Sequence, residues 1–361
     1  MTTAIEYALM AGRAYLTNRG QINQFPIPDG WTEFFHVPDP SILSFPTTNG
    51  FEAVTFKSVA SPKDLVISFA GTDPSDITGD IAADLALAGG TLSAQLRQAA
   101  DYYLQIKNDS ANAGKTISFT GLSLGGGLVS LMAVMFGESA YTFDQAPFLN
   151  SAKTFATTDF LTGNTIPRSV AQDLRGYLAG KVPDDQLVKL DSYITAADPG
   201  NPNPNATDTL FARGAQVTNI NTQGEFLSSW FLVPSSNRIG SQSIISNSNG
   251  GVSGLDLHSQ ALLTAFLQSN QTAAPNKGLN DVTFKLPDLL KMIFDSNLFA
   301  YTTAKTNTTD PNFLEYIVQH EAGIQKLYHP DIELSKRYHN QFEVFKLLYK
   351  QLEPLFDQAH K

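Results

Sequence analysis

Hydrophobic positions along this chain alternate between short continuous runs and longer stripes with helical spacing. Residues 64–70, DLVISFA, are almost continuously apolar, as is typical of a strand buried on both faces of a parallel sheet. Residues 91–107 carry an apolar stripe that predicts an amphipathic helix. The stripe consists of Leu92, Leu96, Ala99, Tyr103 and Ile106. Strands that alternate with helices in this way predict an α/β fold with a mainly parallel sheet.

The same patterns predict further elements on both sides of this unit. The expected strands cover residues 52–59, 115–120, 140–143 and 215–221. The expected helices cover residues 3–16, 128–136, 169–190 and 261–267, and Thr3 with Glu6 forms a capping box before the first of them. The Pro-rich segment 25–46 and the Ser/Asn/Gly-rich segment 235–254 are expected to be irregular loops.

The spacing of these elements predicts a catalytic domain over residues 1–275, followed by a helical extension over residues 276–361 that packs on it. The piece between the strands near 143 and 215 is longer than a crossover requires. We therefore expect an insertion over residues 148–214, which serves either as a lid over the active site or as a decorating subdomain.

Composition narrows the class of protein. The chain has 361 residues, of which 42% are hydrophobic and only 16% charged, and its net charge is −10. This balance, without a basic cluster, argues against a nucleic-acid partner. The absence of cysteine excludes thiolate catalysis and zinc–thiolate sites. No apolar stretch approaches 18 residues and the N-terminus lacks signal-peptide features, so we expect a cytoplasmic protein or one exported without an N-terminal signal.

The most informative motif is Gly-Leu-Ser-Leu-Gly at residues 121–125, between an expected strand and an expected helix. A serine flanked by two glycines at such a turn is typical of the nucleophile elbow of serine hydrolases, where the tight backbone requires glycine. The alternative is a Gly-rich turn or a small-residue helix contact. In the first interpretation, Ser123 is a nucleophile beside a helix N-terminus, which stabilises developing negative charge.

A serine nucleophile needs a base and an orienting acid, which follow it in the order acid, then histidine, in this type of fold. Of the six histidines, His258 comes after a flexible stretch and directly precedes an expected helix. That placement favours His258 as the base, against the alternative of a surface loop histidine without a role.

The acid is expected just past the carboxyl end of a strand. Glu225 is the only carboxylate in the turn after residues 215–221, and it is our first candidate. Asp198 is the alternative acid, and Asp191 and Asp208 are weaker ones. The oxyanion hole is expected to use the amide of Leu124, next to the nucleophile, and that of Thr72, in the turn after residues 64–70.

At this point the chain resembles class 3 lipases, the fungal-lipase-like branch of α/β-hydrolases, and bacterial lipase- or phospholipase-like members of that fold. The family pattern has an F-R-G-T/S oxyanion turn, then D-W-x-x-D, G-x-S-x-G and a Y-T-F-G-x-P strand end. Its counterparts here are residues 69–72, Asp80 with Asp84, residues 121–125 and residues 140–147. The resemblance implies an α/β-hydrolase fold with Thr72 as the oxyanion residue and Ser123 as the nucleophile.

The chain departs from that pattern in three places. Ala70 replaces the usual arginine, the tryptophan of D-W-x-x-D is absent, and the acid is glutamate where the family usually carries aspartate in an N-D-x-V-P turn. The resemblance covers roughly residues 50–265 and is specific mainly at its two motif turns.

These observations predict a serine carboxylic ester hydrolase of lipase or phospholipase type that needs no metal or other cofactor. The expected substrate is a lipid or small ester, including esters at a lipid interface, with no nucleic acid and no transmembrane segment. A thioesterase or acyltransferase with the same triad is one alternative. A catalytically silent hydrolase fold that serves as a binding module is the other.

Overall fold

The computed structural model describes most of the chain up to residue 267. The described residues are 2–15, 25, 27–38, 51–61, 64–71, 93–153, 157–158, 165–166, 169–196, 205–228, 237–245, 254–258, 260, 263–264 and 267. The expected helical extension over residues 276–361 lies outside them and stays a prediction.

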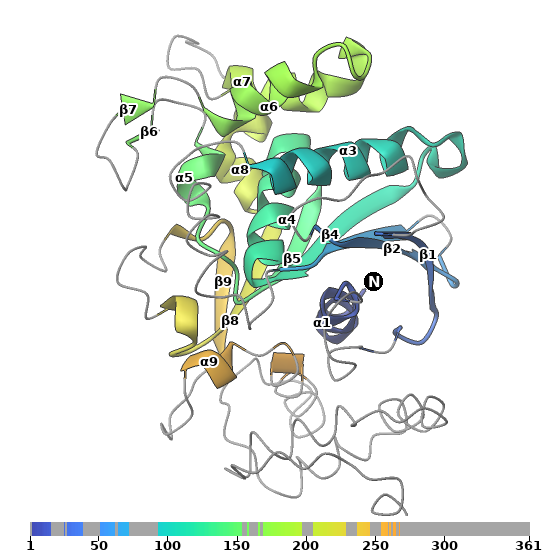
Figure 1. Cartoon of the computed structure of the whole chain (residues 1–361), viewed down its shortest axis with the longest axis vertical. Coiled ribbons are helices and arrows are strands. Elements are labelled where there is room, and N and C mark those ends of the chain that lie inside the picture. Colours follow the sequence, from blue (N-terminus) through green and yellow to red (C-terminus); the bar gives the residue numbers. More distant parts are fainter. Residues whose placement is uncertain are drawn as a thin grey trace, which may run out of the picture.

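A twisted seven-stranded sheet forms the centre of the described structure (Figure 1), with the order β1-β2-β3-β4-β5-β8-β9. Its strands are β1 (Trp31–Val37), β2 (Ala53–Ser58), β3 (Asp64–Phe69), β4 (Thr116–Leu122), β5 (Ser139–Phe143), β8 (Val217–Thr222) and β9 (Ser241–Ile245). The pairs from β3 to β9 are parallel, whereas β1 and β2 are antiparallel additions at one edge. The mainly parallel sheet that the apolar runs predict is therefore confirmed.

Helices cover both faces of this sheet. They are α1 (Ala4–Arg13), α3 (Ala94–Asn108), α4 (Ser123–Phe136), α5 (Leu149–Ala152), α6 (Val170–Leu178), α7 (Val188–Ala196), α8 (Leu210–Gly214) and α9 (Gly254–Leu257). Short 3₁₀ turns (η3–η6) lie at Ser110–Asn112, Asp184–Leu187, Ala206–Asp208 and Phe226–Ser228, and a two-stranded ribbon pairs β6 (Thr157–Thr158) with β7 (Thr165–Ile166). Helix α1 lies on one face, and α3 and α4 lie on the other (Figure 1).

Each face of the sheet has its own core. On the first face, helix α1 contributes Tyr7 and Met10, which are buried with strand residues such as Val66 and with Leu263. On the second face, α3, α4, α6 and α7 bury a larger apolar cluster. Helix α4 is buried along its whole length, because it lies between the sheet and these outer helices. The strand and helix that flank the predicted elbow are therefore central to the fold.

The described elements confirm most of the predicted ones. The capping box of Thr3 and Glu6 is present, with the Glu6 amide donating to Thr3 Oγ1 and the Thr3 amide donating to the Glu6 carboxylate. The predicted loops were wrong in two places, because strand β1 lies within residues 25–46 and strand β9 within residues 235–254. Both are edge strands with several polar side chains, so neither shows the continuous apolar run of a central strand.

The expected insertion over residues 148–214 contains α5, α6, α7, α8 and the β6–β7 ribbon. Helices α6 and α7 contribute Leu174, Leu190 and Tyr193 to the larger core, so this part of the insertion packs on the central sheet. Its role as a lid stays a prediction. Within the described residues, no helix combines the length and apolar character needed to cross a membrane.

Candidate active site

The turn from β4 into α4 carries Ser123 in a strained backbone conformation. Its φ is +56°, in the left-handed region that residues with a side chain rarely adopt. A Cβ added at Gly121 would lie 2.6 Å from the carbonyl carbon of Gly125, and one added at Gly125 would collide with the Phe69 carbonyl. Glycine is therefore required at both positions for the chain to turn this tightly, and Ser123 is held at the first residue of a buried helix.

The structure brings Ser123, His258 and Glu225 into one line of contacts. His258 Nε2 lies 2.8 Å from Ser123 Oγ, and His258 Nδ1 lies 2.7 Å from Glu225 Oε2. A carboxylate only accepts hydrogen bonds, so Nδ1 carries the proton on that side and Nε2 is left to accept from the serine hydroxyl. Residues that are 33 and 135 positions apart in sequence thus form a relay with the geometry of a nucleophile, a base and an orienting acid.

His258 is held from two sides. Gly254, at the start of α9, approaches the turn of Glu225 so closely that a Cβ there would lie 3.1 Å from the Gly224 carbonyl oxygen. On the other side, Gln260 Nε2 donates to the Ala8 carbonyl of α1 at 2.7 Å. The imidazole is 9% exposed, so its position is fixed by packing as well as by hydrogen bonds.

Glu225 is fully buried in the turn after β8, and four of its donors lie among the described residues. Besides His258, these are the Leu227 amide at 2.7 Å, Ser228 Oγ at 2.6 Å and Arg238 Nη2 at 2.6 Å. Burial by itself raises the pKa of this carboxyl, but His258, Arg238 and Ser228 outweigh it and lower the pKa to about 2. Glu225 is therefore an anion throughout the physiological pH range.

A second buried carboxyl lies at the end of β5. Asp144 is fully buried and has a φ of +38°, at the position where the family strand end carries glycine. Its Oδ1 accepts from the Thr222 amide at 2.7 Å, which ties the end of β5 to the end of β8. Burial and the nearby charge of Glu225 raise the pKa of Asp144 well above its usual range, and Thr222 and Arg238 offset only part of this rise.

Of the two donors expected in the oxyanion hole, Leu124 lies within the described residues. Leu124 is the second residue of α4, and its amide is one of the first four in the helix, which have no acceptor inside it. Thr72 lies outside the described residues. The preceding residue is fixed, because the Gly71 amide donates to the hydroxyl of Tyr15 at 2.8 Å. Tyr15 follows α1, so the N-terminal helix positions the start of this turn.

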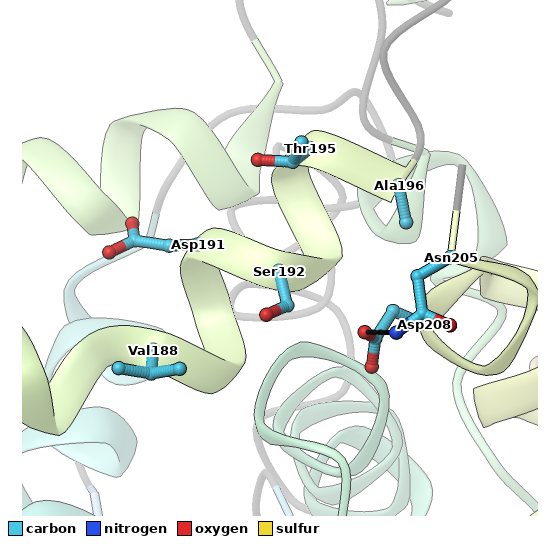
Figure 2. A pocket seen from close by; sticks show the side chains of 7 residues that line it. All are labelled: Val188, Asp191, Ser192, Thr195, Ala196, Asn205 and Asp208. Carbon is cyan, nitrogen blue, oxygen red and sulfur yellow. Dashed lines mark hydrogen bonds between the residues drawn. The ribbon is translucent and has the colours of Figure 1, made fainter. Parts of the chain in front are cut away.

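The alternative acids lie elsewhere or outside the described chain. Asp191 and Asp208 line an open depression of about 420 Å³ beside α7 (Figure 2), and none of the three residues of the relay lines it. Asp191 pairs with Arg175 at 2.6 Å, and Asp208 pairs with Arg213 at 2.7 Å. Both carboxylates therefore serve ion pairs between helices. Asp198, like the family-pattern pair Asp80 and Asp84, lies outside the described residues.

Two residues of the site were missed in the sequence analysis. Arg238 lies inside the segment read as a loop, and an isolated arginine there carries no signal of a buried role. Asp144 had a detectable signal, since it stands where the family motif has glycine. In the described part of the chain, no group of three or more histidine, aspartate or glutamate side chains is placed to hold a metal ion.

A mainly parallel sheet, a strained serine between β4 and α4, and an acid and a histidine after later strands define an α/β-hydrolase. Residues 6–177 match the phospholipase-like family model described as a Tle-like phospholipase domain. The chain thus has an α/β-hydrolase fold, and residues 6–177 are similar to phospholipase-like proteins. The matched residues include Ser123 and end before Glu225, Arg238 and His258.

Solved structures of lipases and esterases are distantly similar to this chain. M37 lipase is 13% identical with a TM-score of 0.31, covering 89% of both chains. Carboxyl esterase 2 from the mycorrhizal fungus Tuber melanosporum is 15% identical with a TM-score of 0.26, covering 72% of this chain and 93% of its own. An esterase of the bacterial hormone-sensitive lipase family is 12% identical with a TM-score of 0.26, covering 68% of this chain and 89% of its own. A comparison with curated proteins found no match.

Proposed function

We propose that this protein is a serine carboxylic ester hydrolase of lipase or phospholipase type. The observation that carries the proposal is the unbroken contact from Ser123 Oγ through the His258 imidazole to the Glu225 carboxylate, with spacings of 2.8 and 2.7 Å. The strained conformation of Ser123 supports it, because backbone strain at a buried nucleophile position is retained where the surrounding structure enforces it.

The proposed reaction has two halves. Ser123 Oγ attacks the ester carbonyl carbon while His258 Nε2 takes the hydroxyl proton, and the carbonyl oxygen becomes an oxyanion. The tetrahedral intermediate collapses, His258 returns the proton to the leaving alcohol, and an acyl-serine remains. Water then attacks the acyl carbon with His258 again as base, and collapse releases the acid and restores Ser123.

Glu225 and the turn amides support these steps. Glu225 holds the Nδ1–H tautomer of His258 and stabilises the imidazolium that forms in each half. The amides of Leu124 and Thr72 donate to the oxyanion, where a single such donor is worth about 10²–10³ in rate. The aliphatic part of a lipid ester would be held by residues of the 148–214 insertion acting as a lid.

Covalent labelling with a fluorophosphonate probe tests this proposal directly. We expect one equivalent of probe on Ser123, and loss of labelling in Ser123→Ala. An unlabelled wild-type protein with no esterase activity would favour the silent binding module. A panel of triglycerides, phospholipids, short esters and acyl thioesters, with and without micelles, then separates a lipase from a phospholipase and both from a thioesterase or acyltransferase.

A further inference from the structure

Glu225 forms a buried ion pair with Arg238, a residue outside the proposed triad of Ser123, His258 and Glu225. Arg238 is 4% exposed and Glu225 is fully buried, and Arg238 Nη2 lies 2.6 Å from Glu225 Oε1. This is the carboxylate oxygen that does not face His258, which contacts Oε2. Burial of a guanidinium is costly unless it is paired and hydrogen-bonded, so its place beside the acid is a strongly constrained feature of the fold.

The three nitrogen atoms of the Arg238 guanidinium each donate a hydrogen bond. Besides Glu225, Nε donates to the Gln145 carbonyl at 2.6 Å, and Nη1 donates to Ser228 Oγ at 3.3 Å. Ser228 in turn donates to the same Glu225 oxygen at 2.6 Å. The guanidinium and the hydroxyl therefore fix Oε1 from two directions. A planar fork suits this task better than a lysine ammonium.

Arg238 and the residue after it also contact Gln145, which lies just after β5. The side chain of Gln145 accepts from the Ile239 amide at 2.8 Å and donates to the Ile239 carbonyl at 3.2 Å, so the residue after Arg238 is held by both backbone groups. The next residue, Ala146, donates its amide to the Ser123 carbonyl at 2.9 Å. One short segment after β5 thus connects the serine turn with the arginine.

We propose that Arg238 is a positioning residue for Glu225, which orients the carboxylate toward His258. The inference rests on the proposed function and deepens it. Glutamate has one more rotatable bond than aspartate, so its carboxylate needs an additional anchor to present Oε2 to the imidazole. The guanidinium also contributes to lowering the pKa of Glu225 and so helps to keep the carboxylate ionised.

The charged and titratable groups around this pair come from several elements. Glu225 faces His258, Arg238 and the buried carboxyl of Asp144 at the end of β5. His258 faces Glu225 and Ser123, with the Phe226 ring 6.5 Å away between centroids. Burial, and to a lesser extent the charge of Glu225, raise the pKa of Asp144 well above its usual range. Arg238 is the permanent charge in the set.

The test compares Arg238→Gln, which removes the charge, with Arg238→Lys, which retains it without the planar fork. The readouts are kcat and KM on a p-nitrophenyl ester and the rate of fluorophosphonate labelling. For Arg238→Gln we expect kcat to fall about 10²-fold through misplacement of the acid, with KM near the wild-type value. For Arg238→Lys we expect a smaller loss of kcat, again with little change in KM.

Arg213→Lys is the matched control. Arg213 is similarly buried and forms an ion pair with Asp208. It also donates hydrogen bonds to backbone carbonyls of α4 and α7. We expect Arg213→Lys to lower thermal stability without lowering kcat. A folded Arg238→Gln protein with the wild-type kcat and labelling rate would overturn the inference. If Arg238→Gln does not fold, a wild-type kcat in Arg238→Lys would overturn it. Wild-type protein that neither labels nor hydrolyses esters would instead overturn the proposed function.

Discussion

Asp144 and Glu225 are two fully buried carboxyl groups whose surroundings move their pKa values in opposite directions. Glu225 accepts from His258, Arg238 and Ser228 and has a pKa of about 2, whereas Asp144 has one backbone donor, Thr222, and a pKa well above its usual range. Two carboxyls that influence each other so strongly do not both ionise readily. Glu225 therefore carries the negative charge of the site, whereas the surroundings of Asp144 favour the neutral form of that carboxyl.

Glu225→Gln is expected to reduce kcat on p-nitrophenyl esters by about 10³–10⁴-fold, because an amide favours the wrong imidazole tautomer. Glutamine keeps the shape of the side chain but leaves the buried Arg238 without its counter-charge, so thermal unfolding is measured in parallel to show that the variant is folded. Asp191→Asn, whose carboxylate pairs with Arg175, is the control and should hydrolyse at the wild-type rate. Comparable rates for Glu225→Gln and wild type would show that another acid, such as Asp198, orients His258.

Asp144→Asn is expected to stabilise the protein more at pH 8 than at pH 5. The folded-state pKa of Asp144 is raised, so the folded state binds the proton more tightly and wild-type stability falls as pH rises above the unfolded-state pKa. The loss is at most about 1.4 kcal/mol per pH unit, and asparagine removes it while its oxygen still accepts from Thr222. Thermal unfolding of both proteins at the two pH values measures the difference.

The exposed Asp184 offers a control for that experiment, since its side chain is 80% exposed. Asp184→Asn should change the melting temperature by a similar small amount at both pH values. If the gain from Asp144→Asn is equal at pH 5 and pH 8, the buried carboxyl is not protonated in the folded state.

Gly125→Ala is expected to destabilise the protein by about 3 kcal/mol and to abolish fluorophosphonate labelling, because the added methyl group collides with the Phe69 carbonyl. Gly214→Ala is the matched control. No atom lies within 4 Å of a Cβ built at Gly214, the last residue of α8, so that change should alter the free energy of unfolding by less than about 0.5 kcal/mol. Chemical denaturation with parallel labelling distinguishes the two. Full labelling of a stable Gly125→Ala protein would contradict the elbow geometry.

Tyr15→Phe is expected to lower kcat by about 10-fold with little change in KM, because the Gly71 amide loses its acceptor and the turn that carries Thr72 is less well held. Tyr7→Phe is the control, because it also removes a tyrosine hydroxyl but at a site away from that turn. The Tyr7 hydroxyl contacts Ser118 Oγ at 3.0 Å. Steady-state kinetics should show reduced kcat for the Tyr15 variant alone. Equal kinetic effects in both variants would indicate a general role of α1 in stability.

The central part of the fold could be predicted from the sequence because its signals are local. Strand β3 is an almost unbroken apolar run, and α3 and α1 have apolar stripes at helical spacing. Strands β1 and β9 could not be predicted in this way. Each is held by backbone pairing with another strand, and most of its residues are partly or fully exposed at the sheet edge, so neither shows a clear apolar pattern.

The candidate site also has a part that local sequence signals predict and a part that depends on long-range contacts. The elbow at residues 121–125 is readable from sequence, because the steric demand for glycine on both sides of a strained serine acts within five residues. The contact of His258 with Ser123 spans 135 residues, and only the packing of α9 against the Glu225 turn makes it. The burial of Arg238 and the raised pKa of Asp144 depend on which strand ends lie side by side. The sequence alone thus determined the tight turn at Ser123 and the order of the elements, whereas the tertiary structure decided the charge environment of Glu225, because burial and electrostatic pairing are properties of three-dimensional proximity.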